Sequence, residues 1–333
     1  MPILMPPSEP LSEDAARFLA IGRCADGIRQ FAAEQYDTDE IAAGMAAALA
    51  AAMPMRDHRP LVPPAARLLR IAWQHELAAR LGDVFDDPTM RRAMAHNLPG
   101  NAYYALFNAR RAFNLIRGTS NKQHTGIHKE FANSGLAVLP LPWSASLTGD
   151  PERVDQCRVS PSAWFTPCKV DPMQADQRPA AYLFAALRMT RRWKIDRARE
   201  DWLRDSRRNR RPNGEPYKKL PAAARQQLVA GQWPTTLLDF VYELRRRADY
   251  EHVDEYIADT GDAAMERFHD GVLFLADSGL LLIEAQIAAY TGIDAFQRAA
   301  AEWTGRTDDK LGGWASGNVR SRVEIIAAYG SHR

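Results

Sequence analysis

Apolar residues recur every three to four positions along most of this chain, a spacing typical of amphipathic helices. The pattern is clear in residues 11–35, where Ser12 is expected to cap the first turn and Glu13 to favour the positive end of the helix. Further helices are predicted over 39–53, from 63 to 81, over about 87–97 and over 101–118. The spacing therefore predicts an all-α protein.

The pattern changes between residues 136 and 180, where seven prolines predict irregular structure or short strands. Residues 181–211 return to helical spacing, and two more helices are predicted over about 235–258 and 261–291. The remainder, rich in glycine, is predicted to be a loop that ends in a short helix near 319–328.

Composition narrows the class of protein. The three cysteines are widely separated and form no C-x-x-C pair, which argues against a zinc ribbon or a disulfide framework and indicates a reducing cytoplasm. The N-terminus lacks the basic region and cleavage signal of a secretory leader. Asp277 and Glu284 interrupt the apolar run 272–290, so no membrane span is expected.

Several familiar catalytic motifs are missing from the sequence. There is no G-x-x-x-x-G-K-[ST] phosphate loop, no G-x-G-x-x-G, no H-E-x-x-H and no G-x-S-x-G. The eight histidines also lack the spacing of metal ligands. We therefore expect no bound metal and no cofactor.

A net charge of +2 says little about partners, but the stretch 188–219 is strongly basic. It holds thirteen Lys and Arg residues against five acids, a local charge of +8, with Trp193, Trp202 and Tyr217 nearby. Arginines interleaved with aromatic rings favour nucleic-acid binding, although a solvated helix face would look the same. The predicted RNA contacts are Arg207, Arg208, Arg210 and Arg211.

Two separate segments carry a family resemblance. Residues 102–131, AYYALFNARRAFNLIRGTSNKQHTGIHKEF, resemble the first half of a HEPN domain, the helical family named for higher eukaryotes and prokaryotes nucleotide-binding. The matching positions are Tyr103, Tyr104, Ala105, Phe107, Ala109, Ala112, His124, Gly126 and Phe131. Residues 237–290, with the run LRRRADY, are similar to the second half.

This resemblance implies a domain arrangement. A HEPN-like bundle would be built from residues 99–135 and 235–292, separated by a basic insertion over 136–234. Extra helices over 1–98 would precede it, and a C-terminal tail over 293–333 would follow. We expect the two halves of the bundle to pack together although about 100 residues lie between them in the sequence.

The resemblance also implies a catalytic motif. Ribonucleases of this family carry R-x(4–6)-H, and here Arg245, Arg246 and Arg247 all lie at that distance from His252. Arginine would bind the phosphate and histidine would move the proton, so no metal is needed. Arg245 shares a face with His252 on a continuous helix, whereas Arg247 suits a helix that breaks near Asp249. The candidate catalytic residues are Arg245, Arg247 and His252.

The leading functional hypothesis is a metal-independent endoribonuclease of the toxin–antitoxin or phage-defence type, acting on RNA as a face-to-face homodimer. A non-catalytic HEPN module is the alternative, binding RNA, a nucleotide, or a partner such as an antitoxin or a nucleotidyltransferase. A structural scaffold is the third possibility. His124 and His128 are expected to be structural or loop residues.

Overall fold

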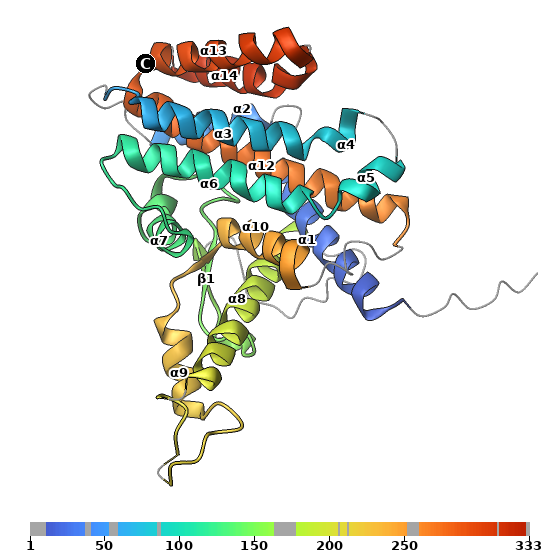
Figure 1. The fold of residues 1–333 in the computed structure, drawn as a ribbon, viewed down its shortest axis with the longest axis vertical. Helices are drawn as coiled ribbons and strands as arrows, with labels where there is room; N and C mark the ends of the chain where they lie inside the picture. The colour runs from blue at the N-terminus through green and yellow to red at the C-terminus, as the bar shows by residue number, and fades with distance from the viewer. Residues whose placement is uncertain are drawn as a thin grey trace, which may run out of the picture.

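Helices make up most of this protein, as the sequence predicts, and the fold is all-α (Figure 1). The fold is that of a computed structural model. It describes residues 11–36, 41–52, 59–84, 88–162, 178–205, 207–211, 213–251, 260–311 and 313–330.

The N-terminal part is a succession of helices. They are α1 (Glu13–Tyr36), α2 (Ile41–Ala52), α3 (Pro63–Ala79), α4 (Leu81–Val84), α5 (Pro88–Met94) and α6 (Leu98–Ile116). The predicted cap of α1 is confirmed, because the hydroxyl of Ser12 accepts from the backbone N–H of Ala15 at 3.1 Å. Both α3 and α6 have proline in the first turn, where a missing N–H costs no hydrogen bond.

The middle of the chain is more irregular. Its elements are α7 (His124–Glu130), η1 (Phe131–Gly135), η2 (Leu136–Val138), β1 (Ser146–Thr148), η3 (Val154–Gln156), β2 (Arg158–Ser160), α8 (Pro179–Arg204), α9 (Ala222–Gly231) and β3 (Thr235–Thr236). The three strands form an antiparallel sheet in the order β2-β1-β3, with Leu147 opposite both Val159 and Thr235. Helices α8 and α9 form an arm that projects from the body of the protein (Figure 1).

The described residues of the C-terminal part, up to Gly330, are mostly helical. It consists of α10 (Leu237–Arg246), the π-helix η5 (Arg247–Glu251), α12 (Asp262–Thr291), α13 (Ile293–Leu311), η6 (Gly313–Ser316) and α14 (Gly317–Gly330). The predicted α-helix over 235–258 therefore becomes a π-helix at Arg247.

The loop predicted at the start of the tail is wrong, because α13 occupies this segment. Phe296, Ala300 and Trp303 recur at helical spacing and are buried. Gly305 lies on the exposed face of α13, where nothing packs on it. Burial of one apolar face outweighs the low helix propensity of a single glycine.

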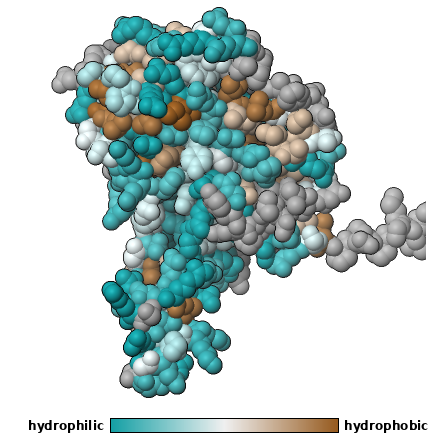
Figure 2. All heavy atoms as spheres, in the orientation of Figure 1, coloured by the Kyte–Doolittle hydropathy of each residue, from teal (hydrophilic) through white to brown (hydrophobic). Residues whose placement is uncertain are grey.

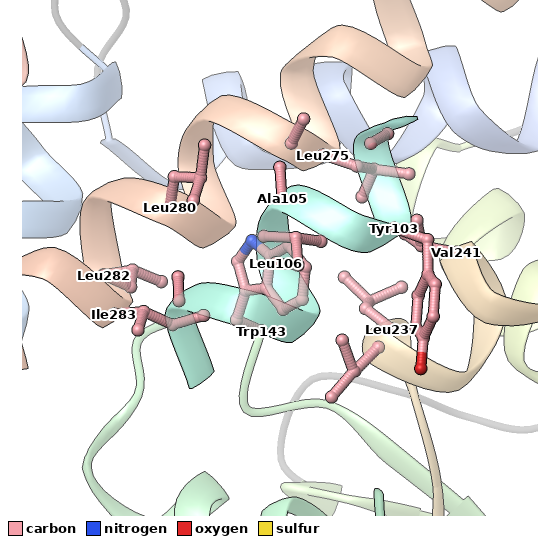
Figure 3. Packing of buried hydrophobic residues seen from close by; sticks show 14 of the residues in the cluster. Tyr103, Ala105, Leu106, Trp143, Leu237, Val241, Leu275, Leu280, Leu282 and Ile283 are labelled. Atoms are coloured by element: carbon pink, nitrogen blue, oxygen red, sulfur yellow. The ribbon is translucent and has the colours of Figure 1, made fainter. Parts of the chain in front are cut away.

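Helix α12 lies at the centre of the core and contacts α1, α2, α6 and α13. The predicted packing of the two separated segments is confirmed, since α6 contacts both α10 and α12. Figure 3 shows Leu106 and Trp143 close together below α12, which carries Leu280. A Cβ placed on Gly279 would lie within 2.6 Å of both Leu106 and Trp143, so glycine allows this close approach.

By length and composition alone, α12 could cross a membrane. However, 78% of its most apolar window is buried inside the protein. Such burial is typical of the core helix of a soluble protein.

A buried charge cluster attaches α14 to the body. Arg322 donates from Nε to Glu284 at 2.8 Å and from Nη2 to Glu76 at 2.7 Å. Glu284 also accepts from the indole of Trp73 at 2.7 Å. Burial raises the pKa of Glu284, while the neighbouring Arg322 opposes the rise. Removing one residue of this cluster would leave a buried charge without its partner, which is costly. The cluster therefore favours one position of α14 against the body.

Candidate active site

The first turn of α10 holds a carboxylate in a fixed position. Asp239 and Thr236 form a capping box, in which Oδ2 of Asp239 accepts from the backbone N–H of Thr236 at 2.9 Å. The hydroxyl of Thr236 accepts from the backbone N–H of Asp239 at 3.4 Å. This reciprocal cap leaves Oδ1 of Asp239 for other partners.

Oδ1 of Asp239 meets three side chains from distant parts of the chain. It accepts from Nδ1 of His128 at 2.9 Å and from Nε1 of Trp233 at 3.4 Å, and Nζ of Lys194 lies 3.3 Å away. Burial on its own would raise the pKa of Asp239, but Lys194 and the His128 hydrogen bond bring it well below its usual range. The carboxylate is therefore ionised at neutral pH.

A chain of hydrogen bonds continues from Asp239 toward the surface. The hydroxyl of Tyr103 lies 3.0 Å from Nε2 of His128 and 2.7 Å from Nδ1 of His124. Asp239 accepts from Nδ1 of His128, so in the uncharged form of His128 the Nε2 atom accepts the Tyr103 proton. The Tyr103 oxygen then accepts from Nδ1 of His124, which leaves the lone pair of His124 on Nε2. We call Asp239, His128, Tyr103 and His124 the relay.

His124, at the outer end of the relay, lies between aromatic rings. It stacks on Phe107 with ring centroids 4.3 Å apart and on Tyr242 at 5.8 Å. Burial lowers the pKa of His124, and the positive charges of neighbours including Arg245 lower it further. The imidazole is therefore neutral at pH 7 and can accept a proton.

The relay opens into a cavity of about 320 Å³ between α7, α8 and α10. This relay cavity is lined by residues that include His124, Lys194, Arg197, Trp233, Tyr242 and Arg246. Lys194 lies 4.3 Å from the centre of the Trp233 ring. Burial lowers the pKa of Lys194, and Asp239 opposes this shift. Arg197 binds Glu243 with both terminal nitrogens.

The three consecutive arginines predicted to bear the catalytic motif have different surroundings. Arg245 donates to Asp249 at 2.9 Å and lies 5.1 Å from the centre of the Tyr104 ring. Arg247, the first residue of η5, lies 4.5 Å from the centre of the Trp193 ring. Only Arg246 lines the relay cavity. The divergence follows from the rotation of about 100° per residue along a helix.

His252, the predicted proton-transfer residue, lies outside the described residues. Its distance from Arg245 and Arg247 is therefore not part of the site geometry. The π-helix begins at Arg247, so the helix is neither the continuous α-helix that favoured Arg245 nor broken at Asp249.

The four arginines predicted to contact RNA are all exposed and lie in the loop between α8 and α9, far out on the arm. Arg208 pairs with Asp205 at 3.3 Å and Arg211 with Glu215 at 3.9 Å. Exposed ion pairs of this kind contribute little to stability. The arginines of the loop can therefore release these carboxylates and bind phosphate groups instead. Figure 2 shows the arm covered mainly by hydrophilic residues.

Sequence reasoning missed the relay cavity. The spacing of His124 and His128, four residues apart on one helix face, is its only local signal. Both histidines line the cavity, but His128 is buried and hydrogen-bonded as a structural residue would be, whereas His124 is only half-buried. In the part of the chain that the structure describes, no group of three or more His, Cys, Asp or Glu residues could hold a metal ion.

Comparison with protein-family models, with curated proteins and with solved structures finds no match to this chain. The function therefore has to be argued from the site itself.

Proposed function

We propose that this protein is a metal-independent endoribonuclease of the HEPN type, acting in the cytoplasm in a toxin–antitoxin or phage-defence system. The observation that supports this proposal is the relay, which ends in a neutral histidine at a cavity shared with Arg246. RNA cleavage needs a proton acceptor beside the 2′-hydroxyl and positive charge beside the phosphate. His124 and Arg246 supply these two elements.

In the proposed reaction, Nε2 of His124 accepts the proton of the 2′-hydroxyl while the hydroxyl oxygen bonds to phosphorus. The bond between phosphorus and the 5′-oxygen then breaks. That oxygen takes a proton from solvent water, and the products are a 2′,3′-cyclic phosphate and a 5′-hydroxyl. Asp239 stabilises the charge that develops on the relay when His124 gains a proton.

The basic arm supplies a route for RNA to this cavity. Helix α8 carries Lys194 and Arg197 at the cavity, and the exposed arginine loop follows its far end. A phosphate backbone that lies along the arm would therefore meet the cavity at the base of the arm. The HEPN resemblance adds a homodimer in which two such sites face each other.

The decisive experiment incubates the purified protein with a fluorescent oligoribonucleotide in EDTA. We expect His124→Gln to lower the cleavage rate by about 10²–10⁴-fold, because it removes the proton acceptor. His96→Gln is the matched control, since His96 lies between α5 and α6 and does not line the cavity. The product should end in a 2′,3′-cyclic phosphate.

The same assay includes His252→Ala. A loss with His252→Ala but not with His124→Gln would move the active site from the relay cavity to the R-x(4–6)-H motif. Cleavage that requires magnesium, or equal cleavage by all variants, would overturn the mechanism.

A second candidate is a non-catalytic module that binds RNA, a nucleotide or a protein partner such as an antitoxin or a nucleotidyltransferase. The observation that favours it is the charge balance of the relay cavity, where Lys194 pairs with Asp239 and Arg197 with Glu243. RNA binding without cleavage by the wild-type protein would support this candidate.

A further inference from the structure

A second cavity, of about 460 Å³, lies between α1, α8 and the start of η5. Four arginines line it, namely Arg17, Arg188, Arg192 and Arg247. Asp196 is the one carboxylate among its lining residues in the described part of the chain. We call this space the arginine cavity. Among the described lining residues, arginines outnumber carboxylates here, whereas the relay cavity has as many carboxylates as Lys and Arg residues.

The arginines enter from three elements. Arg188 and Arg192 are four residues apart and share a face of α8, while Arg17 comes from α1 and Arg247 from η5. Arg188 donates from Nε to the backbone carbonyl of Pro151 at 2.6 Å. A neutral carbonyl positions this guanidinium without cancelling its charge.

Two of the arginines also pair with carboxylates that do not line the cavity. Arg192 donates to both oxygens of Glu152, from Nε to Oε1 and from Nη2 to Oε2 at 2.8 Å, and Arg17 binds Glu13. Both pairs are substantially exposed, with side-chain exposures of 51% and 44% for Arg192 and Glu152. Solvent screens these exposed pairs, and a ligand that offers several negative oxygens, as a phosphate does, can compete with the carboxylates for the two guanidinium groups.

The rest of the wall is apolar and partly aromatic. It consists of Ala20, Ile21, Phe184, Ala185, Met189 and the Trp193 ring. Apolar walls with a few converging charged groups are typical of small-molecule sites, and the volume falls in their usual range. The apolar wall can pack against a ring of a ligand, and the four arginines that line the cavity can bind an anionic group.

We infer that the arginine cavity binds a phosphorylated ligand with a planar aromatic ring, of the size of a mononucleotide. A planar guanidinium can donate two parallel hydrogen bonds to two oxygens of one phosphate, which favours phosphate over an anion with a single acceptor atom. The ring lies against the apolar wall that includes Phe184 and Trp193. This site is separate from the relay cavity and does not depend on the proposed ribonuclease activity.

The test is isothermal titration of the full-length protein with adenosine 5′-monophosphate, with adenosine and inorganic phosphate as partial ligands. We expect the monophosphate to bind at least tenfold more tightly than either partial ligand. Arg188→Gln and Arg192→Gln should each weaken binding about tenfold or more, since each removes charged hydrogen bonds to the phosphate. Arg204→Gln is the matched control, because Arg204 is an exposed arginine of α8 that does not line the cavity.

Folding of each variant is checked by circular dichroism and thermal unfolding before titration. Undetectable binding of the monophosphate at millimolar concentration would overturn the inference. Binding equal to that of inorganic phosphate would overturn the role of the ring, and unchanged affinity in the two glutamine variants would overturn the location. The titration measures binding and needs no RNA cleavage, so failure of the ribonuclease proposal leaves this test intact.

Discussion

At the scale of single residues, Asp239 makes contacts through both oxygens of its carboxylate. One oxygen caps α10 and the other meets His128, Trp233 and Lys194. A buried carboxylate with a cation beside it is sensitive to loss of its charge, because the cation would remain buried alone. Position 239 therefore links the stability of the fold to the chemistry of the relay.

We predict that Asp239→Asn lowers the free energy of unfolding by about 3–5 kcal/mol, the range found when one partner of a buried ion pair is removed. Urea denaturation at pH 7 measures the change. Asp201→Asn is the control, because Asp201 lines the same cavity with a largely exposed side chain. It should change the free energy of unfolding by less than about 0.5 kcal/mol.

The depressed pKa of Asp239 also predicts a pH dependence. The folded protein holds this carboxylate ionised at a lower pH than the unfolded chain, whose aspartates titrate near 3.9. Its contribution to stability is therefore complete above the unfolded pKa and is lost as the pH falls toward the folded pKa. The stability gap between wild type and Asp239→Asn should narrow from about pH 5 downward, measured by urea denaturation. A constant gap would contradict this assignment.

At the scale of elements, close helix contacts depend on glycine at particular positions. Gly271 of α12 faces α1, where an added Cβ would lie 2.6 Å from the backbone carbon of Ala25. Backbone atoms cannot move aside as a flexible side chain can. Gly305 of α13 has nothing within 4 Å of the same added atom.

The two glycines make a matched pair for a stability test. We predict that Gly271→Ala destabilises the protein by about 1–3 kcal/mol, since it forces α1 and α12 apart. Gly305→Ala should stabilise it by up to about 1 kcal/mol, because alanine favours a helix more than glycine does. Thermal and urea unfolding of both variants check these signs. Equal effects would mean that helix propensity, rather than packing, decides both positions.

The helices were largely predictable because their apolar faces repeat locally, as in α1, α6 and α12. Helix α13 was not predicted, because Gly305 and the glycines that follow the helix in the sequence indicated a loop, whereas burial of Phe296 and Trp303 favours a helix. The relay was also beyond prediction. Asp239 is 111 residues from His128 along the chain, and only the packing of α10 beside α6 and α8 brings Asp239 to the relay.

At the scale of the whole molecule, positive charge gathers at one end. The arm carries the arginine loop, while α13 and α14 lie at the opposite end of the longest axis (Figure 1). Neutralising phosphates releases counterions, so RNA binding through the arm should fall steeply with salt.

We predict that changing Arg207, Arg208, Arg210 and Arg211 together to Glu abolishes RNA binding at moderate salt. Fluorescence anisotropy at several salt concentrations measures the affinity and its salt slope. The control reverses four exposed cations at the other end, Arg298, Arg306, Lys310 and Arg320. If both quadruple variants lose affinity equally, overall charge rather than the arm is responsible.

The arm has one more consequence if RNA is the ligand. Lys194, at the cavity, and Arg204, near the outer end of α8, are ten residues apart, about 15 Å along a rigid helix. An RNA strand held at both places is a bivalent ligand, and the second contact gains from a high effective concentration only when the strand spans the distance. The length of the arm would then set the shortest oligonucleotide that binds tightly, and the affinity should rise sharply once an oligonucleotide exceeds that length.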